Sequence, residues 1–463
     1  MAIRSVLEME LFGKYDVVVV GAGVTGIVAS IRAARQGVKT LLVEGSGVLG
    51  GLVTGGRLTK PTGLIEGGIF KELITRAAGY KGADDQVRSS YWGKYTGVFD
   101  AEVMQRVIIE TIEEAGVEVL LHAAVTDVVR EGNKVKGIHI RTKSGNQLIL
   151  ADVVIDSSGD GDVAELAGAE FMLGRPQDGL TQPITSYFRV LNVDIPAVAQ
   201  DFKENMDDMW ELVVPEKEGA TNEDYALIFF ATGLTKRIEK AIEDGFNWIV
   251  PKDHMTLKGA LIPGELSINV TRVHGNGLNA RDLTRAEIEI RKQAYSVFDF
   301  LKKYVRGFDN AIFLEVAPKL GIRETRRIVG DYILTEHDVR NEARFEDAIG
   351  LCNSPVDVHE PGGVRAIMDN VGNGYGIPFR CLVPKGIEGL LVAGRCISVD
   401  EIAFGSTRNV PACTMTGEAA AIAAAYAAKN GVLPREVPVE DIQREVSRNH
   451  IPLGTPEQIS NHS

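Results

Sequence analysis

YDVVVVGAGVTGIVASIRAARQGVKTLLVE, residues 15–44, is the stretch that decides the fold. The apolar run 17–20 predicts a buried strand, and residues 39–43 predict a second one. Between them, residues 24–36 predict a helix that Gly37 ends as a C-terminal cap. Strand, helix and strand in this order make a βαβ unit of the length that a dinucleotide-binding fold requires.

Three glycines in this unit follow the spacing G-x-G-x-x-G. Gly21 permits the tight turn, Gly23 lets a pyrophosphate approach the backbone, and Gly26 lets the helix pack closely on the strand. Glu44, which ends the second strand, can accept hydrogen bonds from ribose hydroxyls and would repel a 2′-phosphate. The pattern predicts a bound dinucleotide rather than a glycine-rich turn without ligand, and it does not separate NAD from FAD.

Composition bounds the classes of function. The chain has 463 residues, enough for two or three domains, and a net charge of −13, which argues against a nucleic-acid or anionic-membrane partner. No apolar run reaches the length of a membrane span, and the first ten residues do not form a signal peptide. Four scattered cysteines contain no C-x-x-C pair, so we expect no metal site and a reducing, cytoplasmic location.

The segment after this unit predicts more of the same sheet. A second glycine cluster, GSGVLGGLVTGG at 45–56, favours ligand contact over a mobile loop because it directly follows the ribose-binding strand end. We expect an irregular excursion at 80–95, a helix at 100–115 and a buried strand at 117–121. The runs 125–130, 134–142 and 147–150 are separated by glycine turns and predict a three-stranded antiparallel excursion. A separate buried strand is expected at 153–155, and Ser157–Asp162 as a turn before a helix.

From residue 171 the chain mixes strand-like and helical pieces, which predicts an inserted α+β domain. Residues 225–230 favour a strand, and helices are expected at 234–244 and 283–306. The last part returns to the first pattern, with a strand at 390–393, a turn at 404–407, a long helix at 410–429 and a terminal helix at 439–449.

Three arginines crowd within five residues in the inserted part. Arg323, Arg326 and Arg327 surround Glu324. One interpretation is a salt-bridged strand that carries arginines to both faces. The other is an anion site for a carboxylate substrate or a cofactor phosphate, because guanidinium forks match both groups.

Together, these motifs resemble the glutathione-reductase-type FAD flavoproteins. The likeness rests on the first βαβ unit, GGLVTGG, the hairpin excursion, DSSGDGDVA and LLVAGRCIS. More narrowly, LGIRETRRIVGDYILTEHDV and YGIPFRCLVPKGIEGLLVAGRCIS resemble the FAD-dependent oxidoreductase family related to the flavin subunit of heterodisulfide reductase. The resemblance implies an α/β fold: a Rossmann-like FAD-binding domain, with a parallel sheet and a three-stranded antiparallel excursion, in two parts (1–170 and 376–463) around an inserted mixed α+β substrate domain (171–375).

The resemblance also implies which residues bind FAD. They lie on the glycine turns, the ribose-binding strand end and the start of the final helix: Gly21, Gly23, Val24, Thr25, Gly26, Glu44, Gly50, Gly51, Val125, Gly159, Asp160, Gly161, Gly394, Arg395, Asn409, Val410, Pro411 and Ala412. Arg395 departs from the Gly-Asp of many relatives, which favours contact with phosphate over ribityl. With no C-x-x-C pair and no histidine in GGLVTGG, disulfide reduction and histidine-linked flavin are not expected.

The expected function is hydride transfer between flavin N5 and a small-molecule substrate at the interface of the FAD and inserted domains. Arg323 and Arg326 favour an anionic substrate, and Tyr375 is a further catalytic candidate; His254, His274 and Glu324 are possible proton carriers. The alternative is a non-catalytic dinucleotide-binding protein or a subunit of an electron-transfer complex. The sequence leaves the redox partner and the oligomeric state open, a homo-oligomer included.

Overall fold

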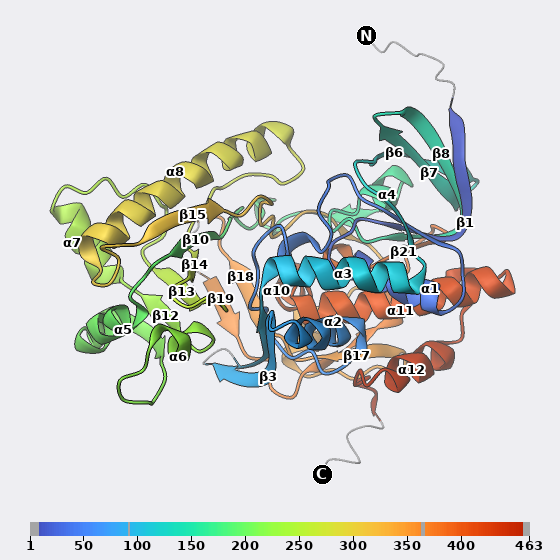
Figure 1. Cartoon of the computed structure of the whole chain (residues 1–463). Helices are drawn as coiled ribbons and strands as arrows, with labels where there is room; N and C mark the ends of the chain where they lie inside the picture. Colours follow the sequence, from blue (N-terminus) through green and yellow to red (C-terminus); the bar gives the residue numbers. More distant parts are fainter. Residues whose placement is uncertain (1–8, 91–92, 363–365, 457–463) are drawn as a thin grey trace, which may run out of the picture.

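The structure is a computed structural model that describes residues 9–90, 93–362 and 366–456. Most of residues 1–10, which we expected not to form a signal peptide, lie outside the described residues. Two sheets organise the chain, one toward each side of Figure 1. Among the helices of the described residues, none is long and apolar enough to cross a bilayer.

The first sheet has seven strands in the described ranges and contains the predicted βαβ unit. Its order is β5-β2-β1-β8-β7-β6, with β21 also paired to β8. β1, β2, β5, β8 and β21 run parallel, and β6 and β7 continue the sheet antiparallel. The strands are β1 (Glu10–Val20), β2 (Thr40–Val43), β5 (Glu118–Leu120), β6 (Ala124–Glu131), β7 (Lys134–Thr142), β8 (Gly145–Asp156) and β21 (Leu390–Val392). The predicted α/β class with an antiparallel excursion is therefore confirmed.

β8 corrects one detail of the prediction. Residues 147–150 and 153–155 were expected as two strands, but they form one continuous strand. The first half of β8 pairs with β7 and the second half with β21, while β1 pairs along nearly its whole length. Because β1 supports it throughout, the strand does not break where its other neighbour changes.

A group of mutually packed helices encloses the larger core together with this sheet. α1 (Val24–Arg35) packs against α11 (Val410–Asn430), and α3 (Ala101–Ala115) against α1 and α2 (Gly68–Gly79), while α12 (Val439–Arg448) packs on α11 (Figure 1). α11 is rich in alanine and buried along nearly its whole length, so backbones approach it closely. A buried ion pair between Arg32 and Glu418 joins α1 to α11. α4 (Asp162–Leu166) follows β8 as predicted.

The second sheet is antiparallel and has six strands in the order β11-β12-β13-β14-β10-β15. The long helix α8 (Ala280–Tyr304) lies along it in Figure 1, and α5 (Ile195–Glu204), α6 (Asn222–Ala226) and α7 (Thr235–Glu243) complete this part. Its strands are β10 (Phe188–Leu191), β11 (Met209–Val213), β12 (Phe230–Gly233), β13 (Met255–Gly259), β14 (Leu266–Asn269) and β15 (Ile312–Val316). A second apolar core from Phe188 to Ala311 fills the space between sheet and helices.

Short two-stranded pairings connect the two parts. β9 (Phe171–Met172) pairs with β16 (Arg327–Ile328), β17 (Ala348–Cys352) with β20 (Tyr375–Pro378), and β18 (Val356–His359) with β19 (Ala366–Asp369). Side chains from Ile328 to Tyr375 pack in the same core as β1. The exact domain boundaries at residues 171 and 375 stay predictions.

Three local expectations were wrong. Residues 80–95 were expected to be irregular, but β3 (Ala83–Ser90) and β4 (Gly93–Phe99) form a hairpin. Residues 404–407 were expected as a turn, but they belong to helix α10 (Glu401–Thr407), which the Asp400 side chain caps by accepting from the backbone of Ala403. Residues 225–230 favoured a strand, but α6 covers the first two and β12 begins only at Phe230.

Candidate functional site

A cavity of about 870 Å³ lies between the two sheets and is lined by residues of both. Gly21, Glu44 and Ser157 reach it from the carboxyl ends of β1, β2 and β8. Those ends are where ligands bind in open α/β sheets. Its volume is near the upper end of the range of about 300–1,000 Å³ for ligand and cofactor sites, so it has room for a dinucleotide and a small molecule.

The glycine turn forms a cradle at one end of this cavity. Gly21 has φ +94°, a conformation that favours glycine. A Cβ on Gly23 would meet no protein atom within 4 Å, whereas a Cβ on Gly26 would lie 1.8 Å from the carbonyl oxygen of Gly21. Gly23 therefore leaves room for a ligand, and Gly26 is required by helix–strand packing. No side chain caps the start of α1 at Gly23, so its first amides can face a phosphate.

Glu44 lies next to this cradle and is 8% exposed. Its Oε2 accepts from the amide of Ala22 at 2.8 Å, and its Oε1 accepts from the amide and hydroxyl of Ser46 at 2.8 and 2.7 Å. Burial alone would raise the pKa of Glu44, but Lys319 and these hydrogen bonds outweigh burial and lower the pKa. Glu44 is thus a fixed carboxylate, suited to accept hydrogen bonds from a ribose.

The structure separates the predicted cofactor residues into two groups. On the wall of the cavity lie Gly21, Gly23, Val24, Thr25, Glu44, Gly51, Gly159, Asp160, Arg395, Asn409 and Val410. The others do not line it: Gly26, Gly50, Val125, Gly161, Gly394, Pro411 and Ala412. Gly394 illustrates the second group, because a Cβ there would lie 2.4 Å from Oγ1 of Thr25. At Gly394 the glycine is therefore required by close packing against Thr25 rather than by contact with the cavity.

Arg395 already has an acidic partner. Its guanidinium forms an ion pair with Asp160 and donates to Oγ1 of Thr325 at 3.0 Å. The expected contact with phosphate is therefore not needed to neutralise this side chain. On the wall of the cavity, the pair joins the turn that follows β8 to the segment that follows β21.

The final helix also reaches the cavity with its N-terminus. Asn409, Val410 and Cys413 line the wall at the start of α11. The Asn409 side chain makes no capping hydrogen bond to the helix amides, since its amide group donates to the carbonyls of Pro355, Gly405 and Ser406. The positive end of the helix dipole can therefore stabilise an electron-rich ligand group.

The three clustered arginines point in different directions. Arg323 lines the cavity and donates to the carbonyl of Pro183 at 2.7 Å. Arg326 does not line it and pairs with Asp162 at 3.0 Å, and Arg327 pairs with the buried Glu324. Arg326 and Arg327 thus form salt bridges, as the first interpretation expected. Arg323 faces the cavity, and its role as an anion site stays a prediction.

Tyr375, the other candidate for catalysis, is fully buried away from the cavity. Its hydroxyl donates to Oγ of Ser406 at 2.7 Å, and burial raises its pKa. The exposed His274 and the paired Glu324 also lie off the wall. His254 does line the cavity, where its ring stacks on Trp210 with centroids 4.0 Å apart.

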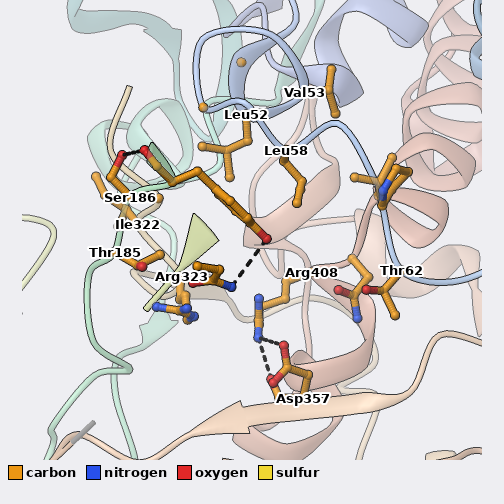
Figure 2. A pocket seen from close by; sticks show the side chains of 18 of the residues that line it. Leu52, Val53, Leu58, Thr62, Thr185, Ser186, Ile322, Arg323, Asp357 and Arg408 are labelled. Carbon is orange, nitrogen blue, oxygen red and sulfur yellow. Dashed lines mark hydrogen bonds and ion pairs between the residues drawn. The ribbon is translucent and has the colours of Figure 1, made fainter. Parts of the chain in front are cut away.

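A cluster of cations forms the far end of the cavity around Arg323. Lys252 precedes β13, Arg272 follows β14, and Arg408 ends α10. Arg408 is held by Asp357 of β18 through Nη2 and Oδ2 at 2.9 Å (Figure 2). Nε2 of His359 lies 3.1 Å from Oδ1 of the same carboxylate. Nothing in the sequence indicated this cluster, because its members come from separate elements without a characteristic spacing.

The fold and this cavity define a flavin- or nicotinamide-dinucleotide protein of the Rossmann type. A family model described as FAD dependent oxidoreductase matches residues 16–446, and the chain belongs to that family. It is an oxidoreductase whose cofactor is FAD, as the sequence predicted. FAD fits the residues present, since the open Gly23 backbone, Glu44 and the α11 N-terminus all face the cavity.

Similarity to individual proteins is more distant. A digeranylgeranylglycerophospholipid reductase of Methanococcoides burtonii is 28% identical over 35% of this chain and 41% of that protein. A glutathione reductase of Yarrowia lipolytica is 27% identical over 36% and 37%. The chain thus spans less than half the length of these relatives. A p-nitrophenol 4-monooxygenase structure from Pseudomonas putida covers 98% of this chain and 92% of its own with a TM-score of 0.48 and 12% identity.

Proposed function

We propose that the protein exchanges hydride between FAD and a small anionic substrate bound between the two sheets. The carrying observation is that Arg323 lies on the wall of the same cavity as the glycine cradle. Arg323 is 8% exposed, and its hydrogen-bond partner is a neutral carbonyl, not a carboxylate. Among the described residues no carboxylate forms a salt bridge with Arg323, and a buried guanidinium in that position favours binding of an anion.

The residues have separable roles in this proposal. The α1 amides and Glu44 would hold the diphosphate and adenosine ribose of FAD, which supplies hydride exchange at its flavin ring when bound. The N-terminus of α11 would face the flavin, and Arg323 would bind an acidic group of the substrate. A fixed acidic group orients the substrate, so that its reacting carbon is held in one position.

The test begins with the visible spectrum of the purified protein, which should show bound flavin. Anaerobic incubation with a panel of saturated and 2-hydroxy acids should bleach the flavin with at least one acid. Its methyl ester should not act, because the ester lacks the charge that Arg323 binds. Equal bleaching by acid and ester would contradict an anionic substrate, and bleaching by NADH alone would contradict direct hydride exchange with an acid.

A further inference from the structure

We propose that the anion site takes a dianion, held by Arg272 and Arg323 together with Lys252. The inference rests on the proposed function for its location beside the flavin. It goes further in fixing the charge of the ligand. The three cations come from different loops at the edge of the second sheet, yet they line one end of one cavity.

Arg272 is a second guanidinium on this wall that forms no salt bridge among the described residues. It is 1% exposed, and its Nη1 donates to Oγ1 of Thr185 at 3.1 Å, Oδ1 of Asn269 at 3.2 Å and the carbonyl of Thr271 at 2.8 Å. All three acceptors are neutral, and its buried Nε has no hydrogen-bond partner. Neither Arg272 nor Arg323 has a carboxylate within 4.0 Å in the part of the chain that the structure describes. Guanidinium groups stay charged in proteins, so two positive charges persist here.

Asp357 offsets only part of this positive charge, although it attracts Arg272 and Arg323. Its Oδ2 is 2.9 Å from Arg408, and Arg408 also donates to the backbone carbonyl of Asp357 at 2.5 Å. His359 beside it is neutral near pH 7, because burial lowers its pKa well below the usual value and the nearby Arg323 adds to that effect. One carboxylate therefore faces the three guanidinium groups of Arg272, Arg323 and Arg408, so two positive charges remain in excess.

Lys252 adds a third group of the same sign. It is 7% exposed and has no carboxylate within 4.0 Å among the described residues. Burial, followed by the neighbouring Arg272 and Arg323, lowers its pKa well below the ordinary value. The acids that act on it are Asp357 and Asp253, and Lys258 and Lys60 are further cations on the wall of the same cavity. Two negative charges from a ligand would neutralise the two guanidinium groups and favour the charged form of Lys252.

Dicarboxylates and phosphate monoesters share this chemistry, since both present two negative charges to guanidinium forks. The test titrates the FAD-loaded protein anaerobically with malonate, succinate and glutarate, each beside its monoamide, and with methyl phosphate beside acetate. Calorimetry gives the dissociation constants, and flavin absorbance reports whether the ligand lies near the ring. We expect at least one dianion to bind about tenfold or more tightly than its singly charged counterpart, as the loss of one charged hydrogen bond implies.

Variants test whether the three cations cause the preference for a dianion. Arg272→Gln and Lys252→Gln should each weaken the preferred dianion about tenfold or more and its singly charged counterpart less. Arg281→Gln, at the exposed start of α8, removes the same charge as Arg272→Gln. It should leave the dissociation constants of the dianion and of its singly charged counterpart unchanged. If the fully buried Arg272 is needed for folding, Lys252→Gln in the loop carries the comparison.

The outcomes separate this inference from the proposed function. If a dicarboxylate or methyl phosphate binds more tightly than its singly charged counterpart, the inferred dianion site is supported. The tighter ligand then shows whether the site takes a dicarboxylate or a phosphate monoester. Equal binding of every dianion and its counterpart overturns it, even where a monoacid bleaches the flavin. Loss of FAD from Arg272→Gln or Lys252→Gln also overturns it, because the cluster would then serve the cofactor. Dianion binding without any bleaching would instead leave the inference standing and contradict the proposed function.

Discussion

The carboxylate of Asp357 and the guanidinium of Arg408 lie 2.9 Å apart on the wall of the cavity, one on β18 and the other at the end of α10. This pair joins the segment after the second sheet to the helix that precedes α11. It also fixes the position of an acid whose charge acts on Arg272 and Arg323. Because one carboxylate faces three guanidinium groups, positive charge remains at this end of the cavity.

Asp357→Asn should destabilise the protein by about 1–3 kcal/mol, because the half-buried Arg408 then loses its acid. Urea unfolding of the FAD-loaded protein measures the change in the free energy of unfolding. Asp178→Asn removes a carboxylate from the more exposed pair with Arg175 and should cost clearly less. Similar losses in the two variants would contradict a stabilising role for the Asp357 pair.

Gly23→Ala and Gly26→Ala form a matched pair on α1. The Cβ that Gly23→Ala adds would project into empty space, so the unfolding free energy without FAD should stay within about 0.5 kcal/mol, while FAD affinity falls. The Cβ that Gly26→Ala adds would meet the Gly21 carbonyl, so the fold itself should lose about 1–3 kcal/mol or more. Unfolding of the FAD-free proteins and FAD titration separate the two effects. Unchanged FAD affinity in Gly23→Ala would place the diphosphate elsewhere.

Glu44→Gln should weaken FAD binding about tenfold or more, because a charged acceptor is worth about 1.5–3 kcal/mol. In this variant the side-chain NH₂ group would also face the backbone N–H of Ala22 or of Ser46, so that two donors oppose each other. Glu113→Gln, on the exposed side of α3, provides the control with the same change of charge. Dissociation constants from FAD titration check this expectation, and equal constants for both variants would show that Glu44 does not serve the cofactor.

His254 should make the protein sensitive to mild acid. Burial, with Lys252 nearby, lowers its pKa to about 4 in the folded chain. An unfolded histidine titrates near pH 6.5, so between about pH 6.5 and 4 the unfolded state binds the proton first and stability falls as pH falls. From pH 7 to 5 this amounts to roughly 2 kcal/mol.

His254→Gln should remove that loss, measured by urea unfolding at pH 7 and pH 5. The exposed His337 on α9 (Glu336–Arg340) provides the control, and His337→Gln should leave the acid sensitivity in place. An unchanged pH dependence in His254→Gln would show that the histidine titrates normally.

The cofactor end of the site could be predicted from the sequence because its parts are consecutive. One stretch of thirty residues contains most of β1, the glycine turn, α1, β2 and Glu44, and the periodicity of each element is local. Backbone groups hold the ligand there, so the glycine spacing is itself the signature.

The substrate end could not be predicted in the same way. Lys252, Arg272, Asp357 and Arg408 meet only after two sheets and the loops between them have packed, and no spacing relates them. Arg323 was found because it belongs to a local cluster, but the sequence could not tell it from Arg326, which turns to Asp162 instead. Tyr375 looked available in the sequence, and packing buries it.

The most direct test of a cavity with a flavin end and an anion end is Arg323→Gln. Its FAD content and its anaerobic bleaching should be compared with the wild-type protein, using the acid that bleaches wild-type flavin best. We predict one FAD per chain in both proteins and bleaching slowed at least about tenfold in the variant, because a charged contact to substrate is lost. Loss of FAD from the variant, or bleaching at the wild-type rate, would contradict the account.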